Sequence, residues 1–187
     1  MKKLSAKKLV GLLVYISKLV KAKLFSKNIS IGKTTRIKNS AEIKNLKIDN
    51  RYGQIDIKPH CSLYNNSSII ARGGNVIIED GCNINYNFKL VSYEKVHIGK
   101  GCAIGPNVCV YDHDHNFNEN GLYPGFKTGE VIIEENCWIG AGCIILRGTR
   151  VGKNSVIGAG TIVKGDIPPN SLVTSSREMV VRPLEKR

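Results

Sequence analysis

The stretch that decides the fold runs from Ile133 to Val163 and reads IEENCWIGAGCIILRGTRVGKNSVIGAGTIV. Large aliphatic residues occupy every sixth position in it: Ile133, Ile139, Ile145, Val151, Ile157 and Val163. An α-helix repeats its apolar residues about every three to four positions, and a half-buried strand repeats them about every two. A period of six instead indicates a solenoid whose flat sides take six residues each, with one aliphatic side chain pointing inward per side.

Glycine and asparagine recur at fixed places between these aliphatic residues. One set of glycines directly follows an aliphatic residue: Gly140, Gly152 and Gly158. A second set of glycines and asparagines lies two positions further along the repeat: Gly142, Gly148, Gly160, Asn136 and Asn154. Both residue types tolerate positive φ, which sharp corners require. Three sides make a coil of about eighteen residues, stacked at roughly 4.8 Å like neighbouring strands. The alternative, a β-sandwich with glycine-rich turns, predicts two-residue alternation and irregular turn spacing.

The same period begins at Ile31 and reaches Val110 with several shifts of register. Five of the six cysteines fill one slot, four residues after an aliphatic: Cys61, Cys82, Cys102, Cys137 and Cys143. Threonine or serine fills that slot at Thr149, Ser155 and Thr161. Because no CxxC pair occurs and the slot favours small residues, we interpret these cysteines as reduced core residues rather than metal ligands or disulfide partners.

The formal net charge of +13 is concentrated at the N-terminus, since residues 1–27 contain eight lysines and no acidic residue. Such a charge is compatible with an anionic partner, either nucleic acid, a membrane surface or an acidic cofactor, and charge alone does not choose among them. Aromatic residues make up only 6% of the chain, and they do not alternate with basic residues as stacking platforms for single strands do. We therefore expect no nucleic-acid partner.

Residues 1–27 are predicted to form a basic amphipathic helix of their own. Apolar residues recur at helical spacing: Leu9, Leu12, Leu13, Ile16, Leu19 and Val20. The longest uncharged run, Leu9 to Ser17, falls far short of the roughly twenty residues that span a bilayer. Three alternatives stay open for this helix: it lies on an anionic membrane surface, it packs on the protein or a sister subunit, or it is a signal peptide without a clear cleavage site.

The repeat breaks at the end of Ile98 to His115, which reads IGKGCAIGPNVCVYDHDH. Functional residues concentrate where loops leave a rigid scaffold, so His113 and His115 are candidates for chemistry. Histidine is suited to act as a general base because its pKa lies near neutrality. On an extended strand, both would point the same way. We expect Asp112 and Asp114 to matter less, since a carboxylate seldom reaches its sequence neighbour's ring. Residues 116–130 are predicted to form a loop that leaves the coil.

Several motifs together resemble those of a known family. The IGPNV repeat, the aspartate-histidine loop, the run NCWIGAGCIILRGTRVGKNSVIGAGTIVKGDIPPNS and a basic tail are similar to those of hexapeptide-repeat acyltransferases, over about Ile31 to Arg182. Within that family, the galactoside, maltose and polysaccharide O-acetyltransferases are the most similar. The resemblance implies an all-β solenoid: a left-handed parallel β-helix over residues 28–174, with a C-terminal tail over 175–187. The handedness rests on the resemblance alone, because the general crossover rule predicts the opposite.

The resemblance also implies partners and site residues. It predicts a homotrimer with active sites between subunits, acetyl-CoA as co-substrate, and no requirement for a metal. His115 matches the catalytic base, and His113 contacts substrate, positions the base or lines the cleft. Asn85 matches an acceptor-binding asparagine, with a corner asparagine as the alternative. Tyr93 stands where relatives have an acidic acceptor ligand. Residues matching the donor site are Trp138, Gly140, Ala141, Ala159, Lys164 and Arg182.

The sequence thus predicts a cytoplasmic, acetyl-CoA-dependent O-acetyltransferase that acts on a sugar hydroxyl in surface polysaccharide or glycolipid biosynthesis. If its N-terminal helix binds membrane, the enzyme lies at the inner face of the plasma membrane. Alternatives are acetylation of a small diffusible acceptor (a free sugar, serine or an antibiotic), N-acetylation of an amino sugar, and a non-catalytic trimeric scaffold. A zinc hydratase is disfavoured, because the four histidines of the chain include no third partner for the close pair.

Overall fold

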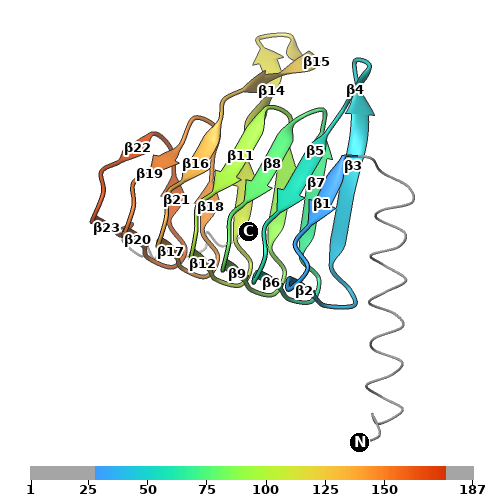
Figure 1. Ribbon diagram of the computed structural model, residues 1–187. Helices are drawn as coiled ribbons and strands as arrows, with labels where there is room; N and C mark the ends of the chain where they lie inside the picture. Colours follow the sequence, from blue (N-terminus) through green and yellow to red (C-terminus); the bar gives the residue numbers. More distant parts are fainter. Residues whose placement is uncertain (1–27, 176–187) are drawn as a thin grey trace, which may run out of the picture.

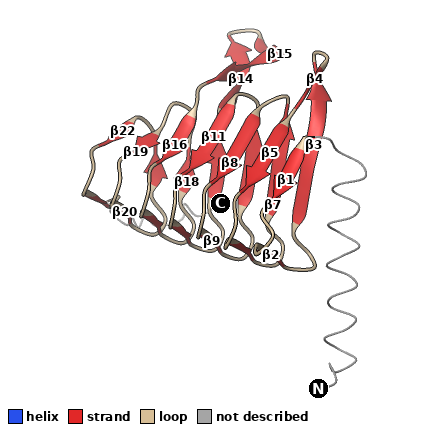
Figure 2. Ribbon diagram, viewed as in Figure 1, coloured by secondary structure: helices blue, strands red, loops and turns tan. Residues whose placement is uncertain are grey.

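A computed structural model describes residues 28–175. The predicted N-terminal helix over residues 1–27 lies outside this range, as does the tail with Arg182. Within residues 28–175, every regular element is a β-strand, and short turns join the strands into a stack of coils (Figure 2). No helix in this range is long and apolar enough to cross a membrane.

Three parallel sheets form the sides of the coil (Figure 1). Side 1 contains β1 (Ile29–Ile31), β5 (Gln54–Ile57), β8 (Asn75–Ile78), β11 (Lys95–Ile98), β16 (Val131–Ile133), β19 (Arg150–Val151) and β22 (Asp166–Ile167). Side 2 contains β2 (Arg36–Ile37), β6 (Ser62–Leu63), β9 (Asn83–Ile84), β12 (Ala103–Ile104), β17 (Trp138–Ile139), β20 (Val156–Ile157) and β23 (Leu172–Val173). Side 3 contains β3 (Glu42–Ile48), β7 (Ser68–Arg72), β10 (Lys89–Ser92), β13 (Cys109–Tyr111), β18 (Ile144–Ile145) and β21 (Ile162–Val163), with β4 (Arg51–Tyr52) antiparallel to β3. This arrangement confirms the parallel β-solenoid and excludes the sandwich.

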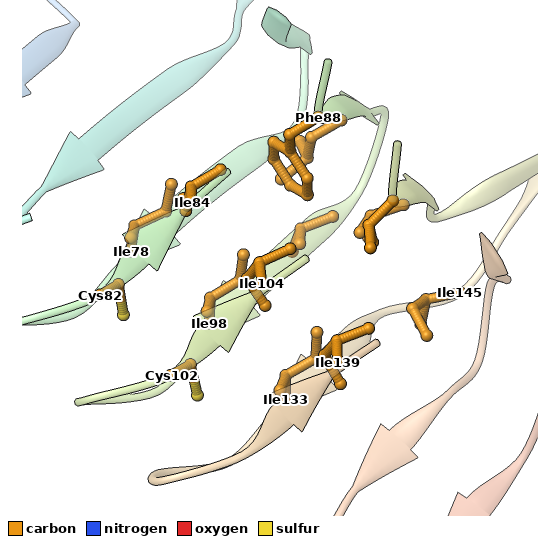
Figure 3. Packing of buried hydrophobic residues seen from close by; sticks show 14 of the residues in the cluster. Ile78, Cys82, Ile84, Phe88, Ile98, Cys102, Ile104, Ile133, Ile139 and Ile145 are labelled. Atoms are coloured by element: carbon orange, nitrogen blue, oxygen red, sulfur yellow. The ribbon is translucent and has the colours of Figure 1, made fainter. Parts of the chain in front are cut away.

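The six-residue period corresponds to one inward side chain per side. Ile98 pairs with Ile133 of the next coil, and Ile104 pairs with Ile139, so identical positions stack into columns (Figure 3). Apart from the partly buried members in the terminal coils, the side chains in these columns are at most 3% exposed. Burial of each such aliphatic side chain contributes on the order of 1.5–3 kcal/mol. The columns therefore stabilise the stacking of the coils, together with the backbone hydrogen bonds between them.

Four of the five cysteines in this slot form a column at the junction of sides 1 and 2: Cys61, Cys82, Cys102 and Cys137. Cys143 lies where side 2 turns into side 3. Each thiol donates to a backbone carbonyl of the next coil: Cys82 Sγ lies 3.1 Å from the Gly99 oxygen, and Cys102 Sγ lies 3.0 Å from the Glu134 oxygen. Ser155 makes the equivalent bond, from Oγ to the Pro168 oxygen at 3.1 Å. Hydrogen bonding with the Cys102 thiol, together with burial, raises the pKa of Cys82 to about 12. The prediction of reduced, buried core cysteines is confirmed for all five.

Corner residues divide into two groups with different physical roles. Positive φ is found at Gly142, Gly148, Gly160, Asn136 and Asn154, as predicted. The glycines that directly follow an aliphatic have ordinary φ, and they are required for another reason. A Cβ added to Gly140 would lie 2.6 Å from the backbone nitrogen of Ala159 in the next coil. Such a contact is too close for any side chain, so glycine at this slot permits the coils to stack.

One hairpin leaves the stack at the junction of sides 3 and 1 (Figure 1). It consists of β14 (His113–Asn118) and β15 (Gly121–Thr128), which pair antiparallel with a bulge after His115. A loop over residues 116–130 was expected here. The structure instead has a regular two-stranded ribbon that begins three residues earlier, and it therefore includes both histidines in its first strand.

Candidate active site

Asp112 lies at the root of the hairpin and is completely buried. Its Oδ2 accepts hydrogen bonds from Ser92 Oγ at 2.7 Å and from the Glu94 amide at 2.9 Å, and its Oδ1 accepts from the Tyr93 amide at 2.8 Å. Burial acts to raise the pKa of this carboxyl, but hydrogen bonds from His113 and from these three donors outweigh it and hold the pKa below its usual value. The carboxylate is therefore ionised near neutral pH and ties one coil to the preceding one.

His113 is the fourth partner of this carboxylate. Its Nδ1 lies 3.3 Å from Asp112 Oδ1, and its side chain is 13% exposed. Tyr93 packs against the imidazole with ring centroids 4.3 Å apart, while Tyr111 and Phe126 approach it edge-on. We expected that a carboxylate would not reach its sequence neighbour's ring. That prediction is wrong for Asp112, because the chain turns sharply out of the coil here and brings the two side chains together.

His115 occupies a different environment two residues further along β14. Its side chain is exposed, and it stands directly across the hairpin from Phe126, with ring centroids 4.9 Å apart. Among residues 28–175, no hydrogen bond to its imidazole is found. Asp114 does not orient it either, since Asp114 Oδ2 instead accepts a 2.5 Å hydrogen bond from Arg147 Nε. The imidazole of His115 is thus supported on one face and open to a substrate on the other.

Tyr93 joins the two histidines to the rest of the junction. Its ring packs on both His113 and Phe126, and its hydroxyl accepts a long hydrogen bond, 3.5 Å, from Arg72. The structure therefore places the predicted Tyr93, His113 and His115 in one cluster. It adds Phe126 at the centre of that cluster, a residue that the sequence did not single out.

Asn85 lies at the other end of side 3, where side 2 turns into side 3. Its Oδ1 accepts a hydrogen bond from the Tyr86 amide at 2.8 Å. The corner conformation belongs to Asn87, which has φ of 60° and donates through Nδ2 to Asn107 at 3.0 Å. The positive-φ position of this corner is therefore Asn87, while both the acceptor-binding role and the corner role stay open for Asn85. It does not meet the histidines within one chain.

Comparisons with known proteins bear on this geometry. Residues 130–164 match the family described as hexapeptide repeat of succinyl-transferase. The chain is 40% identical over 111 residues to a galactoside O-acetyltransferase of Lactococcus lactis, covering 59% of this chain and 54% of the relative. It is 35% identical over 119 residues to the galactoside O-acetyltransferase of Escherichia coli, covering 62% and 57% respectively. The chain is thus similar to hexapeptide-repeat acyltransferases over its repeat region.

The similarity covers only part of the length of the relatives. The chain spans about half the length of the Lactococcus relative, 54%. A solved structure of a maltose O-acetyltransferase from Clostridium difficile superposes with a TM-score of 0.52 and 22% identity, covering 99% of this chain and 80% of that one. At that identity the superposition shows the shared fold. The predicted resemblance to hexapeptide-repeat acyltransferases is confirmed.

In this hexapeptide-repeat chain, the predicted donor-site residues fall at two different junctions. Trp138 is 57% exposed on side 2, and Ala141 and Ala159 are exposed where side 2 turns into side 3. Lys164 is exposed after β21, at the same junction as the hairpin. Gly140 lies beside Ala141, and its lack of a side chain lets the coils stack. Among residues 28–175, no group of three His, Cys, Asp or Glu side chains is placed to hold a metal ion.

Proposed function

We propose that this protein is an acetyl-CoA-dependent O-acetyltransferase that acts on a sugar hydroxyl, with His115 as general base. One observation carries the proposal: an exposed imidazole, held on Phe126, projects from a rigid hexapeptide coil on the β14–β15 hairpin, which leaves the coil between β13 and β16. The galactoside O-acetyltransferases among its relatives support the sugar acceptor. A putative lipopolysaccharide biosynthesis O-acetyl transferase of Escherichia coli, 27% identical, supports a surface glycan.

The proposed chemistry uses one imidazole twice. His115 takes the proton of the acceptor hydroxyl as its oxygen attacks the thioester carbonyl of acetyl-CoA. The C–S bond then breaks, and the imidazolium returns that proton to the departing thiolate, which leaves as the free thiol of CoA. A positioned base of this kind accelerates a reaction by about a hundred- to ten-thousand-fold. His115 has the exposure that both proton transfers require.

We further propose a homotrimer with sites shared between subunits. Within one chain, Trp138 and Ala141 lie at the far end of side 3 from the two histidines. Packing the junction of sides 2 and 3 of one subunit against the hairpin junction of another would unite the two sets. The outer face of side 3 supports such packing, because its outward residues are largely apolar: Ile70, Val91, Tyr111, Ile144, Leu146 and Ile162.

The glycan acceptor and the cellular location are proposed together. An amphipathic helix over residues 1–27, bearing eight lysines, would hold a cytoplasmic trimer at the anionic inner face of the plasma membrane, where lipid-linked glycan precursors are found. Co-sedimentation with vesicles containing anionic lipid tests this point. The wild type should bind, and a variant with Lys7, Lys8, Lys18 and Lys21 all changed to glutamine should not. Equal binding, or none by the wild type, would contradict the membrane proposal.

An acceptor screen tests the activity itself. Purified protein is incubated with acetyl-CoA and a panel of sugars, amino sugars and lipid-linked glycans, and free thiol is measured. We expect thiol release that depends on a hydroxylated sugar and is lost in His115→Ala. Product formed only on amino groups would instead identify an N-acetyltransferase. Binding of acetyl-CoA without transfer to any acceptor would favour a non-catalytic scaffold.

A further inference from the structure

Asp112 makes one contact that its structural role does not require. Three of its four donors, Ser92 Oγ and the amides of Tyr93 and Glu94, belong to the turn of the preceding coil and account for its burial. The fourth, His113 Nδ1 at 3.3 Å from Oδ1, belongs to the hairpin that carries the candidate base. A fully buried carboxylate is thereby connected to a side chain that faces the site.

We propose that Asp112 is a positioning residue that holds the proton of the His113 imidazole on Nδ1, so that Nε2 accepts a hydrogen bond from a second hydroxyl of the sugar, next to the hydroxyl whose proton His115 takes. The role of His113 toward the acceptor rests on the proposed function. The tautomer does not, because it follows from contacts within the free protein.

The tautomer follows from a count of donors and acceptors. An ionised carboxylate only accepts hydrogen bonds, so the imidazole nitrogen facing Asp112 must donate. Neutral imidazole carries a single N–H, and its other nitrogen is then an acceptor. Asp112 is ionised near neutral pH because its hydrogen bonds hold its pKa low. Nε2 of His113 therefore presents a lone pair, and it has no hydrogen-bond partner within residues 28–175.

The ring orientation is fixed by aromatic packing. The centroid of the Tyr93 ring lies 4.3 Å from that of the imidazole. The Phe126 and Tyr111 rings approach the imidazole edge-on, with centroids 5.5 Å and 6.1 Å away. With 13% of the side chain exposed, the ring has little room to turn away from Asp112. Preorganisation of this kind lowers the cost of ordering a substrate at the moment of reaction.

The two histidines therefore have different roles in the proposed reaction. They lie two residues apart on β14, and both rings contact Phe126. His113 is only 13% exposed and contacts a carboxylate, which suits it to hold a neighbouring sugar hydroxyl in one orientation. His115 is exposed and free of any carboxylate contact in the described chain, which suits it to pass a proton from the acceptor to the leaving thiolate.

Nitrogen-15 NMR of histidine-labelled full-length protein, at a pH where imidazoles are neutral, reads the tautomer directly. His113 should show a protonated Nδ1 and an unprotonated Nε2; the signal is assigned by its loss in His113→Phe. His97 provides an internal reference with the opposite pattern, because its Nε2 faces Glu79 Oε1 at 3.3 Å. Protonation of His113 at Nε2 in the wild type would overturn the inference, whether or not the protein acetylates sugars.

Kinetics separate positioning from a purely structural role. His113→Phe keeps an aromatic ring against Tyr93 and removes the acceptor nitrogen. We expect roughly a tenfold rise in KM for the sugar, the size of one lost hydrogen bond, with KM for acetyl-CoA unchanged. Asp112→Asn should produce the same selective rise and a mixture of His113 tautomers, provided circular dichroism shows that it folds. Equal sugar KM values in His113→Phe and wild type would overturn the role in orientation.

If no sugar is acetylated by the wild type, the proposed function fails by itself. The NMR result on the free protein still decides whether Asp112 sets the tautomer of His113, so the two failures are distinguishable.

Discussion

Arg147 Nε, in the following coil, donates a 2.5 Å hydrogen bond to Asp114 Oδ2. Asp114 lies between His113 and His115 in the sequence, so this bond holds the strand that carries both histidines. Asp114 is 45% exposed and Arg147 is 27% exposed, so the pair lies at the surface of the junction. Partly exposed ion pairs contribute little to stability. The pair instead fixes the position at which β14 leaves the coil.

Replacement of Arg147 should therefore affect activity more than stability. Arg147→Met keeps the length of the side chain and removes the hydrogen bond to Asp114. We expect about a three- to tenfold fall in kcat, since small displacements of catalytic groups are costly, with little change in melting temperature. Arg150→Met is the matched control, because Arg150 pairs with Glu134 on side 1, away from the hairpin. Equal kcat values for the two variants would argue against a role for the Asp114 contact.

Loss of His115 should remove most acetyl transfer. His115→Ala deletes an exposed imidazole that has no hydrogen-bond partner in the described chain, so the fold should be retained. Turnover of the preferred sugar should fall by about a hundred- to ten-thousand-fold, the usual contribution of a general base. His97→Gln, on side 1, serves as the control and should keep wild-type turnover. Near-normal turnover in His115→Ala would show that another group is the base.

The buried Asp112 carboxylate should make the protein sensitive to acid. Its pKa is lowered in the folded state, so its stabilising contribution is fully present above the unfolded-state pKa, near 3.9, and is lost as pH falls through the lower folded-state pKa. Urea unfolding at fixed protein concentration, repeated from pH 7 to pH 3, should show wild-type stability falling at the acid end. Asp112→Asn should be less stable at pH 7 and should lose less stability on acidification. Parallel curves for the two proteins would contradict this assignment.

Two neighbouring glycines should respond differently to substitution. Gly140→Ala places a Cβ 2.6 Å from the Ala159 nitrogen, and the backbone of the next coil cannot move aside easily. We expect destabilisation of about 3 kcal/mol, at the upper end of overpacking costs. Gly142 has φ of 68° and open space beside it. Gly142→Asn should be nearly neutral, because Asn136 and Asn154 adopt that conformation at the same slot. Urea unfolding of both variants distinguishes the two roles.

The repeat made the coil predictable because each inward position meets its counterpart in the next coil. Ile98 stacks on Ile133 whatever the details of the corners, so a six-residue period was sufficient to assign the core. The same logic placed the positive-φ corners at Asn136 and Gly142.

The site was only partly predictable, because it lies where the repeat stops. Phe126 falls within a stretch with no period, and only its pairing with His115 across the hairpin shows its importance. The contact between Asp112 and His113 depends on a turn whose geometry no spacing encodes. The composition of the stretch indicated a loop, and cross-strand pairing produced a ribbon instead.

The parallel stack sets fixed distances along the axis of the coil. Each coil contacts only its neighbours and adds roughly 4.8 Å along the axis, so the hairpin after β13 and the exposed Ala141 and Ala159 of the following coils stand at separations counted in whole coils. Insertion of one coil between the hairpin and Ala159 would increase their separation within one chain by a single increment while leaving both ends intact. In such a stack, the number of coils between two groups of residues sets the distance between those groups along the axis.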